Sequence, residues 1–364
     1  MGRSVLRQLN RYIIAGAFLS FLVIAFIACS NGTQDDRIAG ERSPTLTRST
    51  LPPPSQTVVS TPTSRRSDPS RTAIPSEPRT ISGATSCSST QVLAPRGTSV
   101  AYSKYEPLAY LQDEALEDVV RQSLGVEIQH FGVVVTNLAN GRTAMVNAHR
   151  VFSSASLYKV WVMLEIYHQL EGGLLDLGEE YLVTDYYAGL GLNSGELAPC
   201  TVVTANHALG AMMSTSDNVA ARMLLDRVGI GNLNSGLRTL GLHPSGFSEN
   251  GPHVTAQDMA LVFEAISIGE VMNASAHQGM MSLLYTETID NRLPALLPTG
   301  TLVAHKTGSR IDATHDAGVV VSPKATYVVV VLSDYGFSTN AASRIANLSR
   351  DIYDYYNNQR KDLG

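Results

Sequence analysis

The sequence contains few residues of the kinds that hold metals or nucleic acids. It has only three cysteines, Cys29, Cys87 and Cys200. No two of them form a Cys-x-x-Cys pair, so a structural zinc site is not expected. Charged residues make up 16% of the chain, its net charge is -5, and no basic stripe stands out. Nucleic-acid binding is therefore not expected either. A hydrophobic content of 44% is typical of a soluble globular protein.

The first thirty residues have the pattern of an export signal. Three arginines within the first eleven residues precede an apolar run, residues 13–28, which ends at Cys29. This run is shorter than the roughly 20 residues of a membrane span. Residues 26–29 (FIAC) resemble the lipobox of bacterial lipoproteins, which implies a signal peptide over residues 1–29 and a lipid on Cys29. The alternative is an uncleaved anchor helix. Either way we expect an exported protein, at the outer face of the membrane or in the periplasmic or extracellular space.

Residues 30–95 lack aromatic residues and are rich in serine, threonine, proline and arginine. Such a segment cannot bury enough apolar surface to offset the entropy of ordering it, so we predict a disordered tether. In an oxidising compartment Cys87 and Cys200 could form a disulfide, or both could remain free buried thiols. The sequence leaves both possibilities open, because it does not give the Cα separation.

Residues 96–364 form the predicted folded domain. Hydrophobic periodicity predicts a helix, two strands, a mostly helical stretch, three strands and a last helix. The expected ranges are 106–124, 129–138, 142–147, about 152–290, 301–307, 318–321, 327–332 and 339–356. Strands at both ends enclosing a helical insert indicate the mixed α/β (α+β) class. We expect an antiparallel sheet covered by the terminal helices, an all-helical subdomain beside it, and a ligand cleft between them.

A Ser-x-x-Lys pair lies at the start of a helix with apolar residues on nearly every side. Ser156 is at the expected helix N-terminus, where backbone N–H groups favour developing negative charge. Lys159 lies one turn further on the same face. A buried lysine loses its proton more easily and can then act as a base toward the serine hydroxyl. Taken alone, the motif is more often a helix cap followed by a surface lysine.

Two further short motifs follow in order. Ser216-Asp217-Asn218 precedes a helix that ends at Gly229; the serine hydroxyl can relay a proton and the asparagine can hold a substrate amide. Alone, this tripeptide is most often a helix start. His305-Lys306-Thr307-Gly308-Ser309 follows a strand pattern. An edge strand there could pair with a substrate backbone, Lys306 could attract its carboxylate, and Gly308 permits close approach. The alternative is a strand end with a solvated lysine.

The ordered set Ser-x-x-Lys, Ser-Asp-Asn and Lys-Thr-Gly resembles class A β-lactamases and penicillin-binding proteins. Residues 291–300 (NRLPALLPTG) also resemble the family's approach to its Lys-Thr-Gly strand, so the likeness spans about 106–358. It implies a β-lactamase/transpeptidase-like fold with Ser156 as acylated nucleophile, Lys159 as base and Ser216 as proton relay. It further implies Asn218 and Gly308 as substrate-binding residues, and Lys306 and Thr307 as the residues that bind the substrate carboxylate. The backbone N–H groups of Ser156 and Ser309 would form the oxyanion hole, and neither metal nor cofactor is implied.

One family feature is missing from the sequence. Class A enzymes carry a glutamate, in a Glu-x-x-Leu-Asn stretch of a long loop, that activates the water for deacylation. The corresponding stretch here, residues 240–251 (LGLHPSGFSENG), is shorter and lacks that pattern. Glu249 and Asn250 are the only nearby candidates. Glu249 could replace the missing base, but both residues are more simply explained as surface groups of a glycine-rich turn.

Four functions remain open on this evidence. The first is hydrolysis of a small-molecule β-lactam through a Ser156 acyl-enzyme. The second is a D-Ala-D-Ala carboxypeptidase or penicillin-binding protein acting on a cell-wall peptide. The third is a β-lactam sensor that stays acylated, and the fourth is a hydrolase of another ester or amide. The span of the resemblance favours the first. The expected partners are the substrate and, through the N-terminal lipid, a membrane.

Overall fold

The computed structural model describes residues 77–81, 87, 92–99, 102–103, 105–190, 197–336 and 339–358. All of them belong to one compact unit, Pro69–Gly364. The expected signal peptide, the lipidation site Cys29 and the tether up to residue 76 lie outside the described residues. Within the part of the chain that is described, no helix is both long and apolar enough to cross a membrane.

A six-stranded sheet forms the centre of the unit, with the strand order β10-β11-β12-β3-β4-β2. In chain order its members are β2 (Leu111–Gln112), β3 (Phe131–Asn137), β4 (Arg142–Val146), β10 (Leu302–Arg310), β11 (Ala313–Val321) and β12 (Thr326–Ser333). Every neighbouring pair is antiparallel except β2 with β4. The expected antiparallel sheet is therefore confirmed. Strand β10 is longer than predicted and lies at one edge, which leaves its outer backbone groups without a neighbouring strand.

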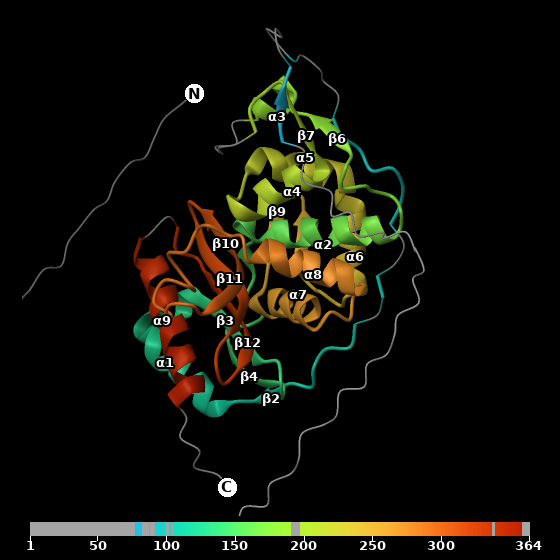
Figure 1. The fold of residues 1–364 in the computed structure, drawn as a ribbon. Coiled ribbons are helices and arrows are strands. Elements are labelled where there is room, and N and C mark those ends of the chain that lie inside the picture. The colour runs from blue at the N-terminus through green and yellow to red at the C-terminus, as the bar shows by residue number, and fades with distance from the viewer. Residues whose placement is uncertain are drawn as a thin grey trace, which may run out of the picture. The chain divides into compact units, whose positions relative to one another are not determined.

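Two helices from opposite ends of the domain cover one face of this sheet. Helices α1 (Glu114–Leu124) and α9 (Thr339–Asn358) pack side by side against it (Figure 1). Helix α7 (Ala256–Ile268) packs on the opposite face, against β3, β11 and β12. Strand residues alternate between the two cores: Val133 packs with α1 and α9, whereas Val134 packs with the helical part. The terminal helices cover the sheet as the sequence predicted.

Most of the remaining elements form the part beside the sheet. They are α2 (Tyr158–Glu171), α3 (Asp185–Ala188), α4 (Ala205–Ser214), α5 (Asn218–Val228), α6 (Ile230–Thr239) and α8 (Ala274–Leu284). Helix α2 is central to this part, because every residue from Lys159 to Ile166 is buried. This explains why its sequence is apolar on nearly every side.

The prediction of an all-helical subdomain was wrong. Two small sheets accompany the helices, with the orders β1-β7-β6 and β5-β9-β8. Their strands are β1 (Arg79–Thr80), β5 (Phe152–Ser153), β6 (Glu180–Leu182), β7 (Thr201–Thr204), β8 (Gly246–Ser248) and β9 (Gly251–Val254). Strands of two to four residues are too short to show the alternation on which strand prediction depends.

The domain begins before residue 95, where we expected the tether to end. Strand β1 pairs with β7, and Cys87 forms a disulfide with Cys200 across a Cα separation of 5.3 Å. Of the two states left open for these cysteines, the structure therefore has the disulfide. Both contacts attach part of the predicted tether to the folded unit.

The first helix begins eight residues later than predicted. Residues 105–110 are held in a non-helical path by Glu264, a fully buried residue of α7. Its carboxylate accepts hydrogen bonds from the Tyr105 hydroxyl at 2.7 Å, the Leu108 N–H at 2.7 Å and the Tyr110 hydroxyl at 3.2 Å. Helix α1 starts only after Asp113, whose side chain accepts from the Leu116 N–H. A tertiary contact thus overrides the local periodicity.

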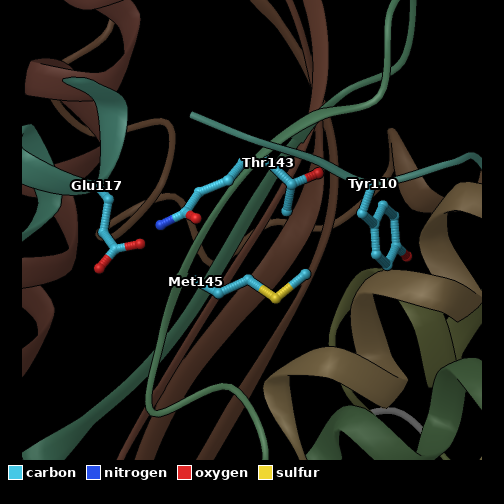
Figure 2. A pocket seen from close by; sticks show the side chains of 5 residues that line it. Tyr110, Glu117, Thr143 and Met145 are labelled. Carbon is cyan, nitrogen blue, oxygen red and sulfur yellow. The ribbon is translucent and has the colours of Figure 1, made fainter. Parts of the chain in front are cut away.

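A cavity of about 320 Å³ lies at the β2 edge of the sheet. Figure 2 shows side chains around it, and its lining residues are Tyr110, Gln112, Glu117, Thr143 and Met145. None of these residues belongs to the three motifs, and the Lys-Thr-Gly strand β10 forms the opposite edge of the sheet. The chemistry of the motifs must therefore be sought elsewhere.

Candidate active site

Ser156 lies in a short 3-10 turn, η2 (Ala155–Leu157), that leads directly into α2. The preceding residue, Ala155, has a φ of 46°, a left-handed conformation that is costly for a residue with a Cβ. The turn is held from both sides: the Ser154 N–H donates to the Pro252 carbonyl at 3.0 Å, and β10 packs against η2. Strain of this kind persists only where the surroundings enforce it, which fixes the position of the serine.

Lys159, one turn into α2, is fully buried and bonded to the second motif. Its Nζ donates to the Ser216 carbonyl at 2.6 Å, to Ser216 Oγ at 3.0 Å and to Asn218 Oδ1 at 2.7 Å. Burial and, after it, the positive charge of Lys306 lower the pKa of Lys159 to about 7; Asp217 and Glu287 act in the opposite direction. A substantial fraction of this amine is therefore neutral near pH 7 and able to accept a proton.

The second motif is positioned by the start of α5. The Asp217 side chain caps the helix by accepting from the Ala220 N–H at 2.8 Å, so Asn218 is the first helical residue. Ser216 precedes the cap with a φ of 59°, a second left-handed residue, and it contacts Lys159. This conformation points the Ser216 carbonyl and hydroxyl at the same lysine. The predicted helix after Ser-Asp-Asn is confirmed, and the first two motifs form one cluster.

The third motif lies along the open edge of β10. Thr307 pairs with Asp316 of β11, and its own N–H points away from the sheet. Because successive backbone N–H groups of a strand point to opposite edges, the Ser309 N–H points to the same open side. This is the orientation that an oxyanion-hole donor needs. Ser156 and Ser309 are both partly exposed, as are Ser216 and Asn218.

Gly308 lies between these two open-edge positions and allows β10 to approach the turn η2 that carries Ser156. A Cβ added there would lie 3.2 Å from Ala155 Cβ, 3.3 Å from the Ser154 carbonyl oxygen and 3.3 Å from His315 Cδ2. The close approach expected at Gly308 therefore exists, but the group that approaches is the turn carrying Ser156. From the sequence we had expected a substrate to approach Gly308.

Lys306 is not the solvated lysine of the simpler interpretation. Its side chain is completely buried and forms an ion pair with Glu287, whose side chain is also completely buried. The same Glu287 oxygen accepts from the Thr307 N–H at 3.1 Å and from Thr307 Oγ1 at 3.1 Å. The two residues expected to bind a substrate carboxylate are thus already bound to an internal one.

Two further residues near the site were missed by sequence reasoning. Arg292 is buried and donates to the Gly308 carbonyl at 3.0 Å and to the Ser309 hydroxyl; it lies in a stretch noted above only for its family likeness. His315 is buried next to the turn that carries Ser156: its Nε2 contacts the Ser153 carbonyl at 2.7 Å and its Nδ1 accepts from the Ser333 N–H at 3.1 Å. Burial lowers the pKa of His315 to about 4, so this imidazole is neutral at pH 7.

The structure does not bring Glu249 into this cluster. Glu249 and Asn250 are exposed in the turn between β8 and β9. Asn250 lines an open pocket with Ser153, His253 and Arg310, whereas Glu249 does not line it. This placement agrees with the simpler interpretation of both residues as surface groups.

Comparison with known proteins places this site in a family. The sequence profile described as "Beta-lactamase enzyme family" matches residues 113–356. The chain is 25% identical to the extended-spectrum β-lactamase PER-1 of Pseudomonas aeruginosa over 70% of this chain and 91% of that protein. It is 27% identical to a β-lactamase of Bacteroides uniformis over 42% of this chain and 60% of that protein.

Solved structures agree in fold. That of PBP-A matches with a TM-score of 0.64 and 22% identity, over 70% of this chain and all of that one. A β-lactamase from Sphaerobacter thermophilus matches with a TM-score of 0.61 and 21% identity, over 68% of this chain and 98% of that one. The chain belongs to the β-lactamase enzyme family. Its function is that of a serine hydrolase of the β-lactamase type.

Proposed function

We propose that this protein hydrolyses β-lactams through an acyl-enzyme on Ser156. The observation that carries the proposal is the position of Lys159, a buried amine with a pKa near 7, bonded to Ser216 and Asn218 one helical turn beyond Ser156. A neutral amine there supplies the base that a serine nucleophile needs. The names of the relatives point to the same substrates.

In the proposed acylation, Ser156 Oγ attacks the lactam carbonyl carbon while Lys159 takes its proton. The charge that develops on the carbonyl oxygen is stabilised by the N–H groups of Ser156 and Ser309, each worth on the order of 10²–10³ in rate. The C–N bond then breaks, and Ser216 relays the proton from Lys159 to the lactam nitrogen. Asn218 would bind the substrate's side-chain amide, and the open edge of β10 would face its other end. Water finally attacks the Ser156 ester and returns the enzyme.

The deacylation step favours a second candidate. Glu249 is exposed in a turn, and the segment from α6 to α7 is short. Without an activated water, the acyl-enzyme would persist, as in a D-Ala-D-Ala carboxypeptidase or penicillin-binding protein that traps the drug. This candidate uses the same Ser156, Lys159 and Ser216.

One experiment separates the two candidates. The full chain is mixed with a chromogenic cephalosporin, and colour and intact protein mass are followed together. Sustained colour without a lasting mass increase is the expected result for a β-lactamase. A single stoichiometric burst with a stable adduct would indicate the penicillin-binding candidate. No reaction at all would overturn both, and Ser156→Ala serves as the unreactive control.

We also propose that the protein is an exported lipoprotein anchored through Cys29 at the outer face of the cell membrane. The arginine-rich start, the apolar run that follows and the lipobox-like end support this proposal. The disulfide Cys87–Cys200 is compatible with it, because disulfides persist in oxidising compartments. Incorporation of labelled palmitate in a bacterial host should be lost in Cys29→Ser. Labelling that survives this substitution would contradict lipidation at Cys29.

A further inference from the structure

Glu287 lies in the segment between α8 and β10, and both oxygens of its carboxylate accept several hydrogen bonds. One oxygen, Oε2, accepts from the Lys306 ammonium, the Thr307 N–H and the Thr307 hydroxyl. The other, Oε1, accepts from the N–H groups of Thr288 at 3.2 Å and Ile289 at 3.3 Å. Both oxygens of this buried carboxylate are therefore satisfied by hydrogen-bond donors, the strongest of them a charged ammonium group.

The ion pair with Glu287 determines whether the buried Lys306 carries a charge. A lysine with no exposed atoms loses its charge unless an opposite charge faces it, because burial disfavours the ammonium form. Glu287 supplies that charge at direct contact. Since the Lys306 side chain is completely buried, it can influence the site through the electric field of its charge.

We propose that Glu287 is a positioning residue of the active site: it fixes Thr307 on the open edge of β10, and it holds the buried ammonium group of Lys306, whose charge acts on the base Lys159. This inference rests on the proposed function, because a positioning role presupposes that Ser156 is acylated. Its structural basis is the buried cluster of Glu287, Lys306 and Thr307.

The charges around the two lysines support this chain of effects. Burial lowers the pKa of Lys306, while Glu287 and Asp316 raise it and Arg292 opposes them. At Lys159 the charge of Lys306 is the largest influence after burial, and it lowers the pKa. Glu287 and Asp217 raise the pKa of Lys159, but each acts less strongly than Lys306.

Neutralising Glu287 therefore has two opposite effects on Lys159. Loss of its negative charge alone would lower the pKa of Lys159. Loss of the Lys306 charge, which Glu287 maintains, would raise that pKa. The proposal holds that the second effect dominates, so the sign of the observed shift is diagnostic.

The test is a pH titration of the Lys159 side chain by NMR in the full chain labelled with ¹³C-lysine. The sequence has five lysines, Lys104, Lys159, Lys306, Lys324 and Lys361, so the signals can be assigned by single substitutions. In Glu287→Gln we expect the titration of Lys159 to move up by about one pH unit, the size of a lost neighbouring charge. The acid limb of Ser156 acylation should move with it, with about a tenfold loss of rate at pH 6.

Three variants keep the test decisive. Glu287→Asp keeps the charge and should leave the Lys159 titration at its original pH. Glu287→Gln combined with Lys306→Met leaves no unpaired buried charge, so it should fold even if Glu287→Gln does not, and it should show the same upward shift. Glu264→Gln, which neutralises another buried glutamate, on α7, should lower stability without moving the titration.

A downward shift in Glu287→Gln, or no shift in either it or the double variant, would overturn the proposal. The NMR readout needs no β-lactam. A chain that fails to react with β-lactams but shows the upward shift would thus disprove the proposed function and leave the role of Glu287 intact.

Discussion

The Lys159 Nζ lies 3.0 Å from Ser216 Oγ and 2.6 Å from the Ser216 carbonyl oxygen, which joins the first two sequence motifs into one hydrogen-bonded cluster. Acylation should therefore depend on the protonation of a single buried amine. With a pKa of about 7, Lys159 is neutral above that pH and protonated below it. We predict that the acylation rate rises with pH through an apparent pKa near 7. Stopped-flow measurement of the acylation rate between pH 5 and 9 gives this apparent pKa. Lys159→Met should remove the pH dependence and strongly reduce the rate. A rate that stays flat across pH 7 would contradict the role of Lys159.

Gly308→Ala tests the close approach of β10 to the turn that carries Ser156. The added methyl group would press on Ala155, the Ser154 carbonyl and His315. We expect the Ser156 turn to shift by a few tenths of an ångström and acylation to fall, by less than the roughly 10²-fold loss that a misplacement of about 1 Å causes. The midpoint of thermal unfolding should change little by comparison. An acylation rate equal to that of the unmodified protein would show that the turn has room to move.

His315 should make stability depend on pH in a defined window. Its pKa is lowered to about 4 in the folded chain, against about 6.5 when unfolded. Between these values the unfolded chain binds a proton that the folded chain does not, so stability is lost as the pH falls from about 6.5 to about 4. His315→Gln lacks this effect. Urea unfolding should show the stability difference between the two proteins shrinking across that window. A constant difference would contradict the neutral, buried imidazole.

The disulfide between Cys87 and Cys200 should stabilise the domain without taking part in catalysis. The two cysteines are 113 residues apart, and cross-links that close long loops restrict the unfolded chain most. Replacing both by serine should lower the free energy of unfolding by about 2–5 kcal/mol. Calorimetry with and without a reductant measures the loss. Acylation kinetics should remain unchanged in the serine variant, and a reductant should then have no further effect.

Glu249 offers a direct test of the deacylation question. Its carboxylate is exposed in the turn between β8 and β9. We predict that Glu249→Gln leaves the rate of acyl-enzyme hydrolysis unchanged, with Asn250→Ala as a neighbouring control. The decay of the acyl mass after a short pulse of β-lactam measures this rate. A clear slowing in the Glu249 variant alone would identify Glu249 as the missing base.

Sequence patterns predicted the large elements of the fold because they follow regular periodicities. The valine-rich run of β12 and the all-round apolar surface of α2 each correspond to one buried environment. The two small sheets were missed, since two-residue strands such as β1 and β5 carry no periodicity. The start of α1 was misplaced because Glu264, more than 150 residues away, holds residues 105–110 in another path.

The site was predicted to the extent that it follows from local motifs. Ser156, Lys159, Ser216 and Asn218 belong to short patterns that helix starts bring together. Glu287 belongs to no pattern: it is a single glutamate in an irregular segment, and its meaning comes from contacts with Lys306 and Thr307. The role of such a residue can be recognised only from the three-dimensional structure.

Acylation of Ser156 is tested most directly by peptide mapping of the chain quenched within its first turnover of a β-lactam. We predict a single acylated peptide in which fragmentation places the added mass on Ser156. We further predict that the modification is absent from Ser156→Ala and strongly reduced in Lys159→Met. An adduct on Ser153, Ser154 or Ser216, or one that survives in Ser156→Ala, would contradict the central claim.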